Sequence, residues 1–268
     1  MAALDYKHPK VQRLRRLLGR RSARLDARAF VAEGAKVVGE ALAAPCGIEA
    51  LFVDPAAVGP AEQALVERAL AAGCPVEQLA PGVLGRVAGT VTPQPVLAVV
   101  PLLDRPLDQL ARDGVLVVCA DVRDPGNLGT VLRSVEAAGV EGVICPDGTV
   151  DPYNPKCVRA SAGALFHVPL VLGGNTVQVL GQLGTWGVRR LGASARAGSS
   201  LWATDLTGPV ALVLGNEASG LPAGLEAGLD GVVSIPIEGR SESLNVGMAA
   251  TVLVYEAARQ RRAGAQRT

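Results

Sequence analysis

The chain has 268 residues, a net charge of +1 and 49% hydrophobic residues. This length suits one large domain or two of ordinary size. No apolar run reaches the roughly 20 residues that cross a bilayer, and residues 1–6 lack the apolar core of a secretion signal. The five cysteines are scattered and there are only two histidines, which argues against a disulfide framework and a zinc site. We therefore expect a reduced, cytoplasmic protein that uses no metal.

Both ends of the chain are basic. Residues 1–36 hold ten basic and three acidic side chains, and residues 256–268 hold four arginines and one acid. Such ends fit contacts with phosphate groups, although a solubilising arm would have the same composition. Near the start, Val11, Leu14, Leu17 and Leu18 recur at helical spacing, which favours an ordered basic helix. With only three Phe, three Tyr and two Trp, the chain is not typical of proteins that stack RNA bases on exposed rings.

The first part of the chain alternates between helices and strands as far as residue 100. Apolar spacing and turn residues predict helices at 35–43 and 61–71 and strands at 48–53, 76–79 and 96–100. A third helix is expected between the last two of these strands. Residues 101–114 contain two prolines and mixed charges, so we expect the domain boundary there.

The second part begins with a buried strand at 115–119 and continues the alternation. Further strands are expected near 143 and 168 and at 188–193, 210–214 and 232–235, and helices from 128, from 155, near 177 and at 244–262. Short apolar strands between helices predict a mainly parallel α/β sheet. Because ligands bind beyond the carboxyl ends of such strands, we expect the site in the loops after Cys119, Ala193, Leu214 and Ile235.

Two of these loops lead into helices and carry polar residues. After the strand at 115–119, Asn127 stands where a helix N-cap is expected, and Arg133 follows on a helix whose inward stripe is apolar. Taken alone, Arg133 could be a solvated residue or an ion-pair partner of Glu136. Before the last helix, Ser243 occupies the expected N-cap position.

Residues 215–220, Gly-Asn-Glu-Ala-Ser-Gly, follow another strand. Their glycines predict a tight turn in which the backbone lies close to a ligand, although an ordinary turn before a helix would look the same. The chain lacks both G-x-G-x-x-G and G-x-x-x-x-G-K-[S/T], which argues against a dinucleotide enzyme and a P-loop nucleotidase. Each segment alone therefore has a structural explanation.

Together, these segments resemble the SpoU (TrmH-like) branch of the SPOUT RNA methyltransferases. Four patterns match in order and spacing, namely N-x-G-x-x-x-R at 127–133, the segment 154–164, G-N-E-x-x-G at 215–220, and I-P-I followed by S-L-N at 235–245. Residues 30–34, with 92–95, also resemble the family's separate substrate-binding domain, which is similar to small ribosomal proteins that bind kinked RNA. The resemblance spans both halves of the chain.

The resemblance implies a domain plan and an activity. It implies an RNA substrate-binding domain with a basic helix over residues 1–103, a linker over 104–113 and a catalytic domain over 114–268. The catalytic domain is expected to be a mainly parallel α/β sheet with a deep trefoil knot, an exception to the rule that chains are unknotted. Members bind S-adenosylmethionine (AdoMet), work as homodimers and methylate a ribose 2′-hydroxyl without a metal. The separate first domain favours ribosomal RNA of the large subunit as the substrate.

The family's residue roles carry over to matching positions. The expected catalytic residues are Arg133, Asn127, Ser243, Asn245 and Glu217. The cofactor is expected to bind, largely through backbone groups, at Gly215, Asn216, Ile235, Ile237, Leu244, Ala193 and Ser194. RNA is expected to meet the basic residues Arg13, Arg16, Arg20, Arg21, Lys36, Arg123 and Arg159. Since a guanidinium stays protonated at neutral pH, we expect Arg133 to stabilise developing alkoxide charge rather than act as a base.

Two other functions remain open. A transfer-RNA ribose methyltransferase would share the catalytic segments, but such members generally lack the extra domain. A non-catalytic RNA-binding factor, acting in ribosome assembly or antibiotic resistance, would have no use for the catalytic residues that the chain retains. Two positions depart from the family pattern, because Gly247 stands where Ser is frequent and Ile237 where Met is frequent. A measurement of AdoMet binding separates an enzyme from a binding factor.

Overall fold

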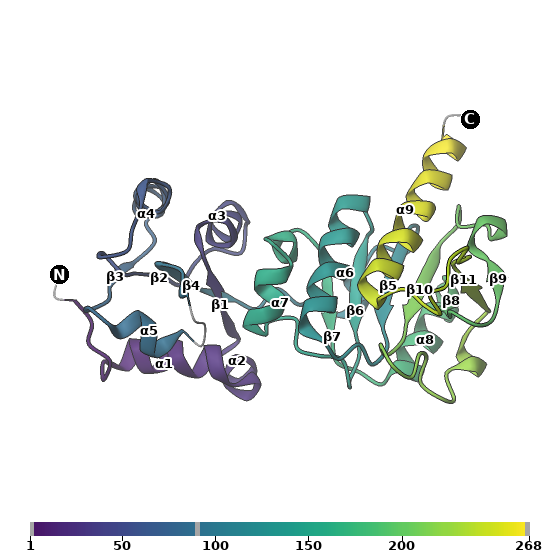
Figure 1. Cartoon of the computed structure of the whole chain (residues 1–268), viewed down its shortest axis with the longest axis horizontal. Helices are drawn as coiled ribbons and strands as arrows, with labels where there is room; N and C mark the ends of the chain where they lie inside the picture. Colours follow the sequence, from purple (N-terminus) through teal and green to yellow (C-terminus); the bar gives the residue numbers. More distant parts are fainter. Residues whose placement is uncertain (1–2, 89–91, 266–268) are drawn as a thin grey trace. The chain divides into compact units, whose positions relative to one another are not determined.

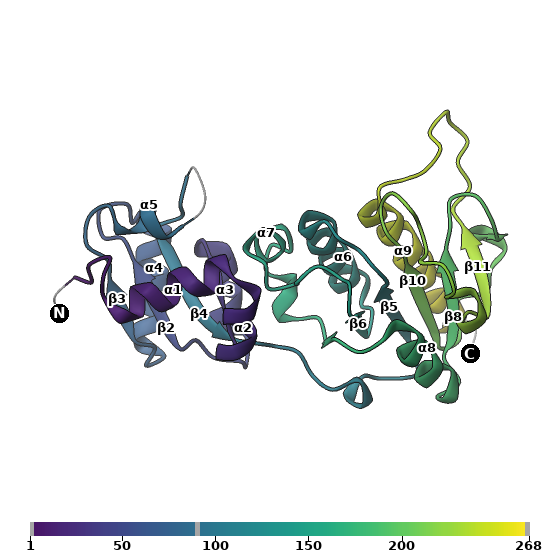
Figure 2. The same ribbon diagram turned by 90° about the horizontal axis from the view of Figure 1, so that it is seen from below.

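The structure is a computed structural model that describes residues 3–88 and 92–265 (Figures 1 and 2). The chain forms two compact units. The first unit holds the residues up to Leu103 together with Asp151–Phe166, and the second holds Asp104–Val150 and the residues from His167 onward. Within the described ranges, no helix is both long and apolar enough to span a membrane, and no three His, Cys, Asp or Glu side chains are grouped to hold a metal ion.

The first unit is built on a four-stranded sheet in the order β1-β4-β2-β3. Its strands are β1 (Ala29–Glu33), β2 (Ala50–Val53), β3 (Val76–Gln78) and β4 (Val96–Pro101), and its helices are α1 (Pro9–Gly19), α2 (Arg21–Ala27), α3 (Ala35–Ala43), α4 (Pro60–Ala71), α5 (Val83–Val87) and α7 (Pro155–Ala160). The predicted elements of this half are confirmed to within two residues. Strand β1 was not predicted, and it pairs antiparallel to β4 with all five residues buried.

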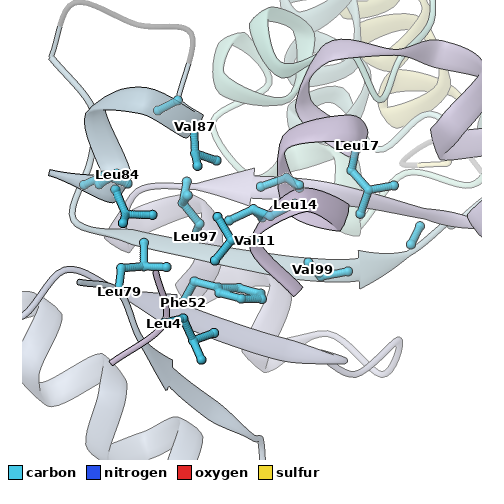
Figure 3. Packing of buried hydrophobic residues seen from close by; sticks show 14 residues of the cluster. Leu4, Val11, Leu14, Leu17, Phe52, Leu79, Leu84, Val87, Leu97 and Val99 are labelled. Atoms are coloured by element: carbon cyan, nitrogen blue, oxygen red, sulfur yellow. The ribbon is translucent and has the colours of Figure 1, made fainter. Parts of the chain in front are cut away.

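The predicted basic helix is two helices, because the backbone at Arg20 is extended (φ −132°, ψ 124°). Val11, Leu14 and Leu17 are buried as predicted. Val11 and Leu14 lie among Phe52 and Leu97 of the sheet (Figure 3). Burial of this apolar stripe therefore holds α1 on the sheet and leaves its arginines at the surface.

Residues 151–166 lie within the range that the sequence assigns to the catalytic domain, and in the structure they pack with the first unit. Arg24 and Asp151 form a buried ion pair, with side chains only 5% and 8% exposed. The Nε atom of Arg24 donates to Oδ2 of Asp151 at 2.8 Å, and Nη1 donates to the carbonyl of Leu17 at 2.7 Å. A second pair joins Arg159 to Glu33 at 2.8 Å. These contacts link the segment to α2 and β1.

Replacing Arg24 with alanine should lower the free energy of unfolding by about 3–5 kcal/mol, because the carboxylate of Asp151 would stay buried without its charged partner. Urea unfolding of the full chain measures this loss. Arg21→Ala is the matched control, since Arg21 is exposed on the same helix and should change stability by no more than about 0.5 kcal/mol. Equal losses in the two variants would contradict a stabilising role for the pair.

The second unit is a seven-stranded, wholly parallel sheet in the order β7-β6-β5-β10-β8-β11-β9. Its strands are β5 (Val115–Cys119), β6 (Gly142–Cys145), β7 (Leu170–Leu172), β8 (Arg189–Ala193), β9 (Ser199–Ser200), β10 (Val210–Leu214) and β11 (Gly231–Ser234), and its helices are α6 (Pro125–Ala138), α8 (Thr176–Thr185) and α9 (Val246–Ala265). Short 3-10 turns of this unit lie at Leu107–Gln109, Leu201–Ala203 and Glu226–Gly228, and another at Ala164–Phe166 lies in the first unit. The predicted parallel α/β sheet is confirmed, and only the two-residue edge strand β9 was not expected.

Helices α6 and α9 cover one face of this sheet and α8 covers the other (Figure 2). The small residues that start α9 allow it to approach α6 closely. A Cβ atom on Gly247 would lie 3.0 Å from Cβ of Thr130. One turn further on, the hydroxyls of Ser134 and Thr251 are hydrogen-bonded at 2.7 Å. This packing sets the amino-terminal ends of α6 and α9 beside the carboxyl ends of the strands.

Candidate active site

Polar residues gather where β5 and β10 end and where α6 and α9 begin. Helix α6 starts at Pro125, and its N-cap is Asp124, whose Oδ1 accepts from the backbone N–H of Asn127 at 2.9 Å. The expectation that Asn127 caps this helix is therefore wrong. The reason is local, because proline suits the first helical position and Asp suits the position before it. The amide side chain of Asn127 is consequently available for other contacts.

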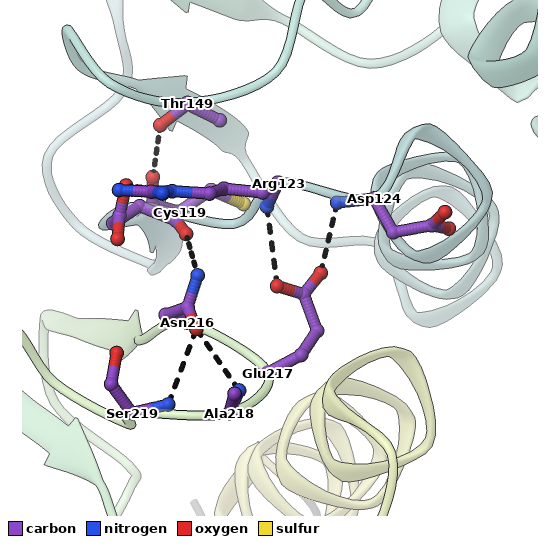
Figure 4. A network of polar contacts seen from close by, with 9 residues as sticks. Cys119, Arg123, Asp124, Thr149, Asn216, Glu217, Ala218 and Ser219 are labelled. Atoms are coloured by element: carbon purple, nitrogen blue, oxygen red, sulfur yellow. Dashed lines mark hydrogen bonds and ion pairs between the residues drawn. The ribbon is translucent and has the colours of Figure 1, made fainter.

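Three of the predicted catalytic residues meet in one hydrogen-bond network. Nδ2 of Asn127 donates to Oε1 of Glu217 at 2.9 Å, and Oδ1 of Asn127 accepts from Nδ2 of Asn245 at 2.9 Å. The backbone N–H groups of Asp124 and Arg123 donate to the two carboxylate oxygens of Glu217 at 3.1 and 3.3 Å (Figure 4). These hydrogen bonds thus fix Asn127 relative to Glu217 and Asn245, which lie 90 and 118 positions further along the sequence.

The environment of Glu217 favours its ionised form. Burial raises the pKa of this carboxyl, but the hydrogen bonds from the Asn127 side chain and from backbone N–H groups outweigh burial and lower the pKa overall. Glu217 therefore acts as an acceptor that orients Asn127 and the loop after β5. It is poorly suited to donate a proton at neutral pH.

The lowered pKa of Glu217 predicts a pH-dependent contribution to stability. Wild type should be more stable than Glu217→Gln at pH 7, since glutamine replaces one acceptor oxygen with a donor that opposes the N–H groups. This difference should persist above the unfolded-state pKa of about 4.3 and disappear as the pH falls through the lower folded-state pKa. Urea unfolding of both proteins between pH 3 and 7 measures it. A difference that did not change with pH would contradict the assignment. Glu136→Gln, an exposed change on α6, is the control.

The loop after β10 closes on itself. The backbones of Asn216 and Gly220 exchange hydrogen bonds of 2.7 and 3.0 Å. Oδ1 of Asn216 accepts from the N–H groups of Ala218 and Ser219, and Nδ2 donates to the carbonyl of Asp121 at 3.1 Å (Figure 4). Asn216, predicted as a cofactor contact, thus uses both its side chain and its backbone to shape the site.

Arg133 and Ser243 stand outside this network. Arg133 is exposed on α6, six residues beyond Asn127 and so roughly 9 Å further along the helix axis. It makes no hydrogen bond or ion pair within the described chain, so the alternative pairing with Glu136 is not observed. Ser243 is also exposed. The expectation that it caps the last helix is wrong, because Asn245 Oδ1 accepts from the N–H of Gly247 at 2.9 Å instead.

The predicted cofactor residues follow three neighbouring parallel strands. Ala193 ends β8 and Ser194 follows it, Gly215 follows β10, and Ile235 follows β11. Among described residues, no hydrogen bond involves the backbone of residues 236–244. Leu244 is 37% exposed, and Ile237 is partly exposed. Unpaired backbone donors and acceptors beside half-open aliphatic side chains fit a ligand with a flat heteroaromatic ring and polar ends.

The predicted RNA-binding residues fall into two groups. Arg16, Arg20, Arg21 and Lys36 are exposed, with no ion pair inside the described chain. The other three are engaged within the chain, since Arg13 pairs with Glu49 at 2.7 Å, Arg123 with Asp121 at 2.9 Å, and Arg159 with Glu33. Arg123 is still 71% exposed.

The sequence analysis missed the role of Asp124 as the N-cap of α6. The signal was present, because an Asp-Pro pair before an apolar stripe is typical of a helix start.

The fold and the site together define a two-domain RNA methylase of the SPOUT class. The SpoU rRNA Methylase family matches residues 114–255, and the MRM3-like substrate binding domain matches residues 8–98. The chain therefore belongs to the SpoU rRNA Methylase family. The predicted family, fold class and substrate-binding domain are confirmed.

Relatives match across both units. The chain is 33% identical over 226 residues to the 23S rRNA (guanosine(2553)-2′-O)-methyltransferase RlmP of Bacillus subtilis. The aligned region covers 84% of this chain and 87% of that protein. It is 32% identical to the 23S rRNA (uridine(2479)-2′-O)-methyltransferase of Streptomyces viridochromogenes, over 96% and 92% of the two chains. The crystal structure of the SpoU methyltransferase AviRb from that organism, in complex with AdoMet, matches with a TM-score of 0.84 and 29% identity, covering 96% of this chain and 100% of the other.

Proposed function

We propose that this chain is an AdoMet-dependent methyltransferase that modifies a ribose 2′-hydroxyl of large-subunit ribosomal RNA. The observation that carries the proposal is the network of Asn127, Glu217 and Asn245 at the carboxyl edge of the parallel sheet. Membership of the SpoU rRNA Methylase family supports the reaction, and an AdoMet-bound structural relative supports the cofactor. The two relatives that match across both units support ribosomal RNA over the transfer-RNA alternative, because both are named as 23S rRNA methyltransferases.

The cofactor would be held at the ends of β8, β10 and β11. Backbone groups of Gly215, Ile235 and Leu244 would bind its polar atoms, with Ile237 and the Ala193–Ser194 turn against the ring. Bound AdoMet supplies an electrophilic methyl group, so no metal is needed. The partly exposed aliphatic side chains and the unpaired backbone of residues 236–244 fit this role.

Arg133 would act on the RNA rather than on the fold. Its exposed guanidinium can hold a phosphate or the ribose and stabilise the negative charge that develops on the 2′-oxygen. A phosphate of the substrate can accept the proton. Asn127, Asn245 and Glu217 would keep the start of α6 in place, and Ser243, in the loop before α9, would reach the ribose from the opposite side.

We further propose the domain roles, the assembly and the location that the resemblance implies. The first unit would bind RNA through its exposed basic residues, and the second would carry a trefoil knot and the chemistry, in a cytoplasmic enzyme. Met248 and Tyr255 are seven residues apart on α9 and are 61% and 50% exposed, which places them on one face and supports a homodimer through this helix. Light scattering tests the assembly, and an active monomer would contradict it.

Mapping of 2′-O-methyl groups on cellular RNA, with and without the gene, tests the function. We expect one or more ribosomal RNA positions to lose methylation when the gene is deleted. A change at a transfer-RNA position with ribosomal RNA unaltered would establish the alternative substrate. Calorimetry with AdoMet tests the non-catalytic alternative, because a binding factor without methyl transfer would show no cofactor affinity.

A further inference from the structure

The break between α1 and α2 creates a hollow on the first unit. Its volume is about 440 Å³, and it is lined by Arg13, Arg16, Leu17, Arg20, Ser22 and Asp26, among others. This volume lies in the range of roughly 300–1,000 Å³ that is typical of sites for small ligands. Leu17 also borders the hollow, but it is only 1% exposed because its side chain packs in the core of the first unit. The hollow is therefore large enough for a nucleotide-sized group.

The charges around the hollow are unequal. Three arginines and one acid, Asp26, line it, and one of the arginines, Arg13, is paired with Glu49. Arg16, Arg20 and Asp26 are all exposed, and none of the three forms an ion pair within the described residues. Arginine forks match the geometry of phosphate oxygens, so Arg16 and Arg20 favour a phosphodiester backbone. A carboxylate repels phosphate, which means that Asp26 must serve another part of the ligand or weaken binding.

Asp26 limits which base can enter the hollow. An ionised carboxylate only accepts hydrogen bonds, through two oxygens side by side. Guanine presents two adjacent donors, N1–H and the N2 amino group, on its Watson–Crick edge. Adenine and cytosine place a ring-nitrogen acceptor beside their amino group, and uracil flanks its single donor with two carbonyls. Only guanine therefore meets the carboxylate with two parallel hydrogen bonds. Unstacked bases in single-stranded RNA expose this edge.

We propose that the α1–α2 hollow binds one unstacked guanosine of RNA, with Arg16 and Arg20 on the flanking phosphates and Asp26 on the donor edge of the base. This inference rests on the proposed RNA-binding function of the first unit and adds a specificity-determining residue to it. Ser22 lies one helical turn before Asp26 on α2 and also lines the hollow, so its hydroxyl can contact the ribose. All residues of this site belong to the first unit, whereas the proposed methylation site is built from residues of the second unit.

Fluorescence anisotropy with short RNA probes tests the inference, using the full chain without cofactor. The probes are labelled hexanucleotides of uridine that carry a single G, A, C or inosine at the third position. We expect wild type to bind the G probe about tenfold more tightly than the A and C probes, the scale of one bidentate contact to a base. Inosine, which keeps N1–H and lacks the amino group, should fall between them.

Asp26→Asn should remove the preference for guanine while leaving affinity for the all-uridine probe equal or higher, because a like charge near phosphate is removed. A merely structural role for Asp26 would weaken all probes alike. Arg16→Ala and Arg20→Ala should weaken every probe and reduce the slope of the salt dependence by about 0.7 for each phosphate that is no longer neutralised. Glu67→Gln and Arg68→Ala, both exposed on α4, are matched controls that should leave base preference unchanged.

The outcomes separate this inference from the function on which it rests. If no probe bound wild type at low salt, the RNA-binding role of the first unit would fall, and the guanosine site with it. If the probes bound through Arg16 and Arg20 without preference for guanine, or if the preference survived in Asp26→Asn, only the guanosine site would be overturned. Methyl transfer by the second unit is measured separately and affects neither result.

Discussion

Replacing Arg133 with alanine should reduce the rate of methyl transfer at least about 100-fold and leave AdoMet affinity within about twofold. The magnitude is that of removing one positioned donor that stabilises charge in a transition state. Arg133 is exposed and makes no hydrogen bond or ion pair with the described residues, so its loss should shift the free energy of unfolding by no more than about 0.5 kcal/mol. Initial rates with tritiated AdoMet, calorimetry and urea unfolding measure the three quantities.

Two further variants separate charge from geometry at Arg133. Arg133→Lys keeps the positive charge but lacks the planar fork, so it should recover only part of the rate. Glu136→Gln changes an exposed carboxylate on the same helix and should leave turnover unchanged. Wild-type turnover in Arg133→Ala would remove this residue from the mechanism.

The strands of the second unit were predictable because burial leaves a strong mark on the sequence. The predicted strands at 115–119 and 210–214 coincide with β5 and β10, in which every residue is buried. A parallel strand covered on both faces reads as a continuous apolar run, so its bounds are sharp. The order of β5, β10, β8 and β11 also places the four predicted loops at one edge. The strand pattern alone thus predicts the edge of the sheet at which the candidate site lies.

The helix starts that border the site were less predictable. In both cases several polar residues in succession can act as caps, and the sequence alone does not rank them. Asp124 caps α6 because Pro125 can begin the helix, while Asn245 caps α9 and at the same time donates to Asn127. The position of the α9 cap thus depends on a hydrogen bond between Asn245 and Asn127, which are 118 residues apart in the sequence. Tertiary contacts, rather than local propensity, therefore set these ends.

The packing of residues 151–166 with the first unit was hidden for a similar reason. Local pattern correctly predicts the helix from Pro155, but the unit to which it belongs depends on partners far away in the sequence. Arg24 and Asp151 are 127 positions apart, and neither stands out locally. A buried ion pair between distant residues leaves no periodic signal, so only the folded chain shows it.

Replacing Gly215 with alanine should destabilise the second unit and inactivate the enzyme. A Cβ atom at this position would lie 2.3 Å from the carbonyl carbon and oxygen of Gly220 and 2.4 Å from the nitrogen of Leu221. These are backbone atoms, so the loop of residues 215–220 would have to open. Overpacking of this kind costs about 1–3 kcal/mol. Because Glu217 lies within the loop, its contacts with Asn127 and Asp124 would shift, and a misplacement of about 1 Å can reduce a rate about 100-fold.

Gly181→Ala is the matched control for this change. Gly181 lies within α8 with no atom near the position of an added Cβ, so alanine there should stabilise the protein by about 0.5–1 kcal/mol. Urea unfolding and methyl transfer by both variants give the comparison. Full activity and unchanged stability in Gly215→Ala would show that the closed loop is not required for the site. Loss of AdoMet binding together with the loss of turnover would support the role of this loop in holding both the cofactor and Glu217.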